Sequence, residues 1–182
     1  RYTMQITFTL NHKKVTAEIA ADTVLLDLVR SFGCKSVKRG CETANCGLCT
    51  VFLDEKPVLS CSVLAARVNG RSVTTLEGLQ EEAAEFGAFI ADQGAEQCGF
   101  CNPGFIMNAL ALFRENPDPG EDEIKEYLDG NLCRCTGYTK IEEAIVAASR
   151  VIEQYANGKG AQQCWSSILS TLSTTLHRAL SP

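Results

Sequence analysis

The sequence predicts an α+β protein of two small domains, in which a sheet with a single helix is followed by an all-helical unit. Short runs near the N-terminus alternate apolar and polar residues, as a half-exposed strand does. From about residue 79 onward, apolar residues recur at three- and four-residue spacings, which is typical of amphipathic helices. A chain of 182 residues is long enough to bury two modest cores.

The first predicted domain, residues 1–78, consists of short strands around one helix. The helix is expected over residues 22–33, with Asp22 or Thr23 as its N-cap and Gly33 as its end. Two strands, then the helix, then further strands is an order that suits a β-grasp sheet. The strands are expected at residues 4–11 and 13–20, twice within 49–61, and once within 71–78.

The second predicted domain, residues 79–158, is a four-helix bundle. Asn102 followed by Pro103 is a helix-start signal, with asparagine as the N-cap and proline as the first helical residue. Thr139 and Glu142 have the spacing of a capping box. The helices are expected at 81–94, 103–116, 120–130 and 139–158.

Residues 159–182 form a tail that neither domain accounts for. Apolar residues between Trp165 and Leu176 recur at helical spacing, which predicts an amphipathic helix. The serines and threonines among them weaken helix formation. Such a helix could pack on its own domain, dock on another subunit, or be an appendage.

Charge and hydropathy exclude two classes of partner. The net charge is -5 and the lysines and arginines form no basic stripe, so nucleic acid is not expected to bind. The chain has no apolar run of roughly 20 residues that could span a membrane. Because its first residues alternate like a strand rather than forming a signal peptide, we expect a cytoplasmic protein.

In a reducing cytoplasm, ten cysteines indicate metal ligation or redox chemistry rather than disulfides. Eight of them fall into two sets of four, and four thiolates are what one [2Fe-2S] cluster requires. The first set begins as C-x4-C-x2-C, the spacing of plant-type ferredoxins. Cys34 and Cys164 stand outside, and Cys34 is expected to be a small buried hydrophobe. The first cysteine set is Cys41, Cys46, Cys49 and Cys61, and the second cysteine set is Cys98, Cys101, Cys133 and Cys135.

The surroundings of both sets suit an anionic iron-sulfur cluster. Gly40 and Gly47 lack side chains, so the backbone can wrap closely and point N-H groups at sulfur. Both pairs of the second set lie just before expected helix N-termini. The positive end of a helix favours an anion there by roughly 0.3 to 1 kcal/mol.

Two zinc sites with four thiolates each are the main alternative. Cys98 and Cys101 form the C-x2-C half of such a site. Four residues separate Cys41 from Cys46, and one residue separates Cys133 from Cys135. Neither is the C-x2-C spacing that is usual in a zinc knuckle. The only histidines, His12 and His177, lie far from either set, which disfavours a Rieske-type centre with imidazole ligands.

Three motifs in this order resemble the iron-sulfur subunit of the molybdenum hydroxylases, which include xanthine dehydrogenases, aldehyde oxidoreductases, and nicotinate and carbon monoxide dehydrogenases. The motifs are GCETANCGLCT at 40–50, QCGFCNPG at 97–104 and GNLCRCTGY at 130–138, and the resemblance covers residues 4–157. It implies a plant-type ferredoxin domain followed by a helical domain, each with one [2Fe-2S] cluster. It also implies that electrons leave a molybdopterin cofactor on a large subunit and pass through both clusters to an FAD-binding subunit.

The resemblance also implies a role for each set. The second cysteine set would hold the cluster nearest the molybdopterin, with Gln97 and Cys135 close to the pterin. The first cysteine set would hold the outer cluster, nearer the flavin. The family usually has glycine two residues before its second cysteine, whereas this chain has Ala44. If that position needs a positive φ, alanine strains the loop.

The sequence offers no catalytic acid-base pair and no substrate pocket. We therefore expect a non-catalytic electron-transfer subunit of an oxidoreductase of the xanthine dehydrogenase type. The alternative is a free-standing ferredoxin-like carrier or a cluster-based redox sensor, but a carrier needs only the first domain. The substrate of the complex stays open between purine, aldehyde, nicotinate and carbon monoxide, because its site lies on the large subunit.

Overall fold

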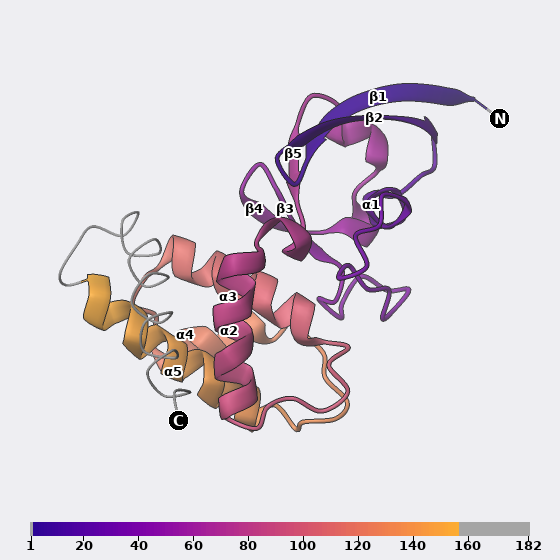
Figure 1. Ribbon diagram of the computed structural model, residues 1–182. Coiled ribbons are helices and arrows are strands. Elements are labelled where there is room, and N and C mark those ends of the chain that lie inside the picture. The colour runs from indigo at the N-terminus through magenta and orange to yellow at the C-terminus, as the bar shows by residue number, and fades with distance from the viewer. Residues whose placement is uncertain (1, 157–182) are drawn as a thin grey trace, which may run out of the picture.

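The computed structural model describes residues 2–156, which form a sheet-containing unit and a helical unit side by side (Figure 1). The helix expected between Trp165 and Leu176 lies outside the described residues, as do Cys164 and His177. None of the helices in the described part combines the length and the apolarity that crossing a bilayer requires.

The first unit is a mixed five-stranded sheet with the strand order β2-β1-β5-β3-β4. Strand β1 pairs with β2 in an antiparallel hairpin and with β5 in parallel, whereas β3 is antiparallel to both of its neighbours. Asn11 and His12 join the hairpin with φ angles of 49° and 66°, the left-handed pair of a type I′ turn. All five expected strands are present: β1 Thr3–Leu10, β2 Lys13–Ala20, β3 Thr50–Leu53, β4 Lys56–Leu59 and β5 Ser72–Thr74.

The single helix of this unit, α1, spans Leu25–Ser31 and is shorter than expected. Neither Asp22 nor Thr23 caps it, so that prediction was wrong. The chain is still extended at the N-cap residue Val24, which forms a bridge with Leu64, and this pairing delays the start of the helix. Gly33 follows the helix with a φ of 94°, as expected for the residue that ends it.

The second unit contains the four expected helices, but both predicted start signals were wrong in detail. Helix α3 begins at Asn102 itself with Cys101 at the cap position, so the asparagine is helical rather than capping. Helix α5 begins at Thr139, and the N-H of Glu142 donates to the Tyr138 carbonyl, so no capping box forms. The helices are α2 Gln80–Asp92, α3 Asn102–Glu115, α4 Glu121–Leu128 and α5 Thr139–Ala156.

Each unit has its own apolar core, and the second core extends into the first unit. The core of the sheet unit lies between the sheet and α1 and includes Cys34 and Cys49. The helical core contains Cys46, Leu48 and Phe52 in addition to residues from its four helices. The segment that carries the first cysteine set therefore lies between the two cores.

Candidate metal centres

The first cysteine set lies on the loop between α1 and β3 and on a short 3-10 helix, Ser60–Ser62, that follows β4. Backbone N-H groups of this loop point at the Cys41 sulfur. Hydrogen bonds from Asn45 and Thr43 lower the pKa of the Cys41 thiol to about 6. A Cβ added at Gly40 would lie 3.2 Å from the Cys46 sulfur, so the backbone passes close to that thiol as well. The loop thus presents N-H donors to sulfur, as a bound thiolate requires.

The four thiols of this set are arranged as two pairs. The thiols of Cys41 and Cys46 lie close enough to influence each other's ionisation, and so do those of Cys49 and Cys61. Each pair joins a partly exposed thiol to a buried one, and burial raises the pKa of Cys49 to about 11. Binding a metal to such a thiol releases a proton, since the ligand is the thiolate.

The second cysteine set is also arranged as two pairs. The sulfurs of Cys98 and Cys135 are 3.6 Å apart, and both residues are exposed. Cys101 is paired with Cys133 and is buried, which raises its pKa to about 12. Gln97 is exposed beside Cys98. These pairs come from the turns before α3 and α5, so the expected placement of thiols at two helix N-termini is confirmed.

Side chains around Cys133 favour its thiolate form. Burial opposes ionisation, but the Thr136 hydroxyl donates to the Cys133 sulfur at 3.1 Å, and N-H groups of Cys135 and Thr136 add to it, so the pKa of Cys133 is lowered. The Cys133 N-H in turn donates to the Tyr138 hydroxyl at 3.0 Å. Thr136 and Tyr138 are functional residues that the sequence reasoning missed, although both lie in the motif at 130–138.

The two pairs in each set fit a two-iron cluster. An iron of a [2Fe-2S] centre takes two thiolates, so two pairs supply the four ligands. Within residues 2–156, no three His, Cys, Asp or Glu side chains converge closely enough to hold a single metal ion. The donor set and the backbone N-H groups therefore suit a [2Fe-2S] group at each set. Which thiols bind it stays a prediction.

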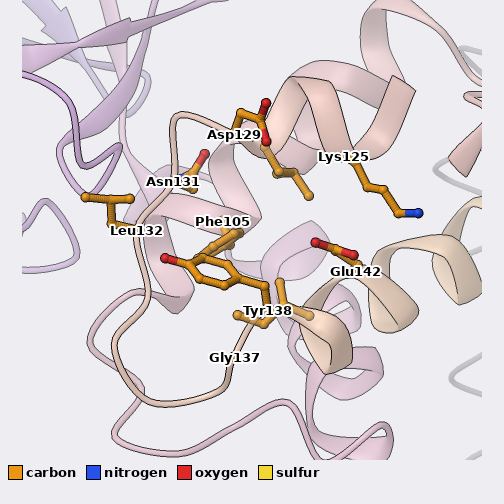
Figure 2. A pocket seen from close by; sticks show the side chains of 10 residues that line it. Phe105, Lys125, Asp129, Asn131, Leu132, Gly137, Tyr138 and Glu142 are labelled. Atoms are coloured by element: carbon orange, nitrogen blue, oxygen red, sulfur yellow. The ribbon is translucent and has the colours of Figure 1, made fainter. Parts of the chain in front are cut away.

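A cavity of the helical unit lies elsewhere. It measures about 370 Å³ and no cysteine lines it. Figure 2 shows the Tyr138 ring beside Phe105, with the charged side chains of Lys125, Asp129 and Glu142 around the opening. Since the Tyr138 hydroxyl also accepts a hydrogen bond from the Cys133 N-H, this residue connects the cavity to the second cysteine set, whose thiols lie outside it.

Ala44 occupies the left-handed region with a φ of 56°, the condition under which the sequence reasoning expected strain. Replacing Ala44 by glycine should stabilise the chain by about 0.5 to 1 kcal/mol, because a Cβ in this conformation crowds the following carbonyl oxygen. The measurement is the free energy of unfolding of the iron-loaded protein. Ala84→Gly, at an exposed position inside α2, is the matched control and should be destabilising. Equal destabilisation by both substitutions would contradict strain at Ala44.

Comparison with known proteins identifies both halves of the chain. Residues 8–70 match the 2Fe-2S iron-sulfur cluster binding domain family, and residues 75–146 match the [2Fe-2S] binding domain family. These matches confirm the expected pair of [2Fe-2S] clusters and the α+β fold, and they leave no place for the zinc alternative.

Relatives extend over most of the chain. The nicotinate dehydrogenase small FeS subunit of Eubacterium barkeri is 45% identical over 136 residues, which are 73% of this chain and 85% of that subunit. The xanthine dehydrogenase iron-sulfur-binding subunit of Escherichia coli O157:H7 is 40% identical over 149 residues, which are 79% of this chain and 93% of that subunit. The structure of quinoline 2-oxidoreductase from Pseudomonas putida 86 superposes with a TM-score of 0.76 at 36% identity. It covers 84% of this chain and 97% of that one.

Three observations lead to the same conclusion. The thiols are paired on two loops, both halves of the chain match [2Fe-2S] domains, and the relatives are small subunits of larger enzymes. The chain works with partner subunits, and its part in the complex is electron transfer. It belongs to the family of iron-sulfur subunits of the molybdenum hydroxylases, the family of the xanthine dehydrogenases.

Proposed function

We propose that the second cysteine set holds the inner [2Fe-2S] cluster, which faces the molybdopterin cofactor of a large subunit, and that the first cysteine set holds the outer cluster, which faces an FAD-binding subunit. A bound [2Fe-2S] centre supplies one-electron transfer, so two of them provide two successive steps. The observation that carries the proposal is the arrangement of each set as two thiol pairs on loops that offer N-H donors to sulfur.

Exposure supports the direction of this relay. Cys98 and Cys135 are exposed, as is Gln97, so this edge of the helical unit is open to a partner. The large apolar side chains of Phe100 and Leu132, which precede Cys101 and Cys133 in the chain, are each 46% exposed, and the Lys38 ammonium lies 5.6 Å from the centre of the Phe100 ring. Apolar side chains at a surface that also carries cofactor ligands suit a contact that excludes water. We therefore assign the large subunit, with its pterin, to this edge.

Two further parts of the proposal concern the chain itself. The domain limits are 1–78 and 79–158, which is supported by the junction between the 3-10 helix Leu76–Gly78 and α2 at Gln80. We place the protein in the cytoplasm, because cysteines grouped for cluster ligation rather than for disulfides suit a reducing compartment.

The presence of one cluster at each cysteine set, on which the proposed relay depends, is tested by the metal content of the full chain purified without oxygen. We expect about four iron and four inorganic sulfide per chain, visible absorption, and two distinct EPR signals after reduction, since the loops differ in exposure and hydrogen bonding. Zinc in place of iron, or one signal with only two irons, would refute it.

Replacing Phe100 by aspartate should weaken co-purification with the large subunit by more than roughly tenfold, because a charge would be buried in an apolar contact. The measurement is the affinity for the large subunit, with iron content checked in parallel. Tyr2→Asp alters an exposed aromatic residue of the sheet unit and is the control, since Tyr2 is 95% exposed. Equal affinities of both variants and of the wild type would place the large subunit elsewhere.

A further inference from the structure

Two glycines allow the backbones of the two units to touch. Gly104 lies in the first turn of α3, and a Cβ at this position would stand 2.7 Å from the Gly47 carbonyl oxygen and 3.0 Å from the Leu48 Cα. A Cβ at Gly47 would stand 2.6 Å from the Asn131 Nδ2 and from the Gly130 oxygen. These separations are too short for a side chain, so only glycine fits at either position.

Asn131 packs against Gly47 from the side of the second cysteine set. Its side chain is 2% exposed, and its Oδ1 accepts a hydrogen bond from the Asn108 amide on α3. Its Nδ2 has no hydrogen-bond partner among the described residues. A buried donor without an acceptor is unfavourable. We therefore attribute the position of Asn131 to its hydrogen bond with Asn108 on α3 and to its close packing against Gly47.

The next residue joins the two cysteine sets. The Leu132 N-H donates to the Cys46 carbonyl at 2.9 Å. Cys46 belongs to the first set, and Leu132 is bonded directly to Cys133 of the second. A route of covalent bonds interrupted by one hydrogen bond therefore runs from the Cys46 thiol to the Cys133 thiol. The close packing at Gly47 and Gly104 lies immediately beside this hydrogen bond.

We infer that Gly47, Gly104 and Asn131 are positioning residues that hold the Cys46 carbonyl against the Leu132 N-H and thereby fix the separation of the two ligand sets. The inference rests on the proposed function, because the separation matters only if an electron crosses between two bound centres. Transfer between fixed centres weakens steeply as they move apart. A methyl group at Gly104 would press on the Gly47 carbonyl and lengthen the only step that this chain controls alone.

The test compares Gly104→Ala with Gly87→Ala in the full chain loaded with iron. Gly87 lies in α2, and a Cβ there would meet nothing within 4 Å, so it is the matched control. Amide exchange at Leu132 is followed by mass spectrometry of overlapping peptides, and the magnetic interaction between the two reduced centres by EPR. In Gly104→Ala we expect exchange faster by roughly tenfold, the change that a loss of about 1.4 kcal/mol produces, together with weaker EPR splitting. Gly87→Ala should match the wild type in both.

A second variant, Asn131→Ala, removes the amide that packs against Gly47 rather than adding a methyl group. It replaces Gly104→Ala in the test if that variant does not fold. It should also speed exchange at Leu132 and weaken the splitting. Variants that carry about four irons but keep the wild-type exchange rate and splitting would overturn the positioning role and leave the proposed function standing. A wild-type chain without iron would instead refute the proposed function. The two failures are therefore distinguishable.

Discussion

Replacing Cys49 by serine in the assembled complex should stop delivery of electrons to the flavin while substrate still reduces the helical-unit centre rapidly. Cys49 is 3% exposed in the core of the sheet unit and is paired with Cys61, so no other thiol of the first set can take its place. A hydroxyl is a much poorer iron ligand than a thiolate. Mutating residues that hydrogen-bond to metal ligands already lowers metal affinity or activity by roughly 10- to 100-fold. Losing a ligand itself should therefore lower turnover by at least about a hundredfold.

Stopped-flow reduction with rapid-freeze EPR follows each centre separately. Cys135→Ser is the informative comparison, because Cys135 belongs to the exposed pair assigned to the pterin side. That variant should slow reduction of both centres by substrate. Fast flavin reduction in a Cys49→Ser complex that has lost its outer centre would reverse the assigned order.

Replacing Cys101 by serine should remove one cluster and lower the iron content from about four to about two atoms per chain. Cys101 is 6% exposed and its thiol interacts with that of Cys133, and its loss leaves the second set with three thiols. The EPR signal of the remaining centre should be that of the first set. Iron and sulfide analysis of anaerobically purified protein, with EPR, measures the effect.

Cys34→Ser is the matched control for that variant. Cys34 is 4% exposed, as deeply buried as Cys101, and its sulfur accepts a hydrogen bond from the Asn11 amide at 3.7 Å. A serine there should lower stability by about 1 kcal/mol and leave all the iron bound. If Cys34→Ser also lost half of the iron, Cys34 would be a ligand and the proposed assignment of the two cysteine sets would be wrong.

The sequence predicted the parts of this protein that depend on local pattern. Strand alternation and helical spacing located the elements, and cysteine spacing grouped the thiols. It failed at the helix starts, where Asp22 and Thr139 had the right residue type for a cap. Caps depend on the direction in which the chain enters the helix, and the Val24 bridge to Leu64 determines that direction for α1.

The contact between the units was beyond sequence reasoning for a different reason. Gly47 and Gly104 are 57 positions apart in the numbering, and nothing local in either motif shows that they meet. Asn131 stands in a motif whose cysteines drew all the attention, yet its burial and its unpaired Nδ2 appear only once α3 and the first loop are packed together. Ala44 is the exception, since the family resemblance already marked its position as one that usually holds glycine, and the structure gives it a φ of 56°.

The core that the two units share limits how the chain can be divided. Leu48 and Phe52 belong to the sheet unit by sequence, yet they are buried among the helices. The Arg114 guanidinium lies 4.7 Å from the centre of the Phe52 ring and also bonds Glu55, so a residue of α3 covers this side of the sheet. A fragment ending near residue 78 would carry these apolar side chains on an open surface. Its aggregation would then reflect the missing cover and not a defect of the sheet, so recombinant fragments are a poor source of either centre in isolation.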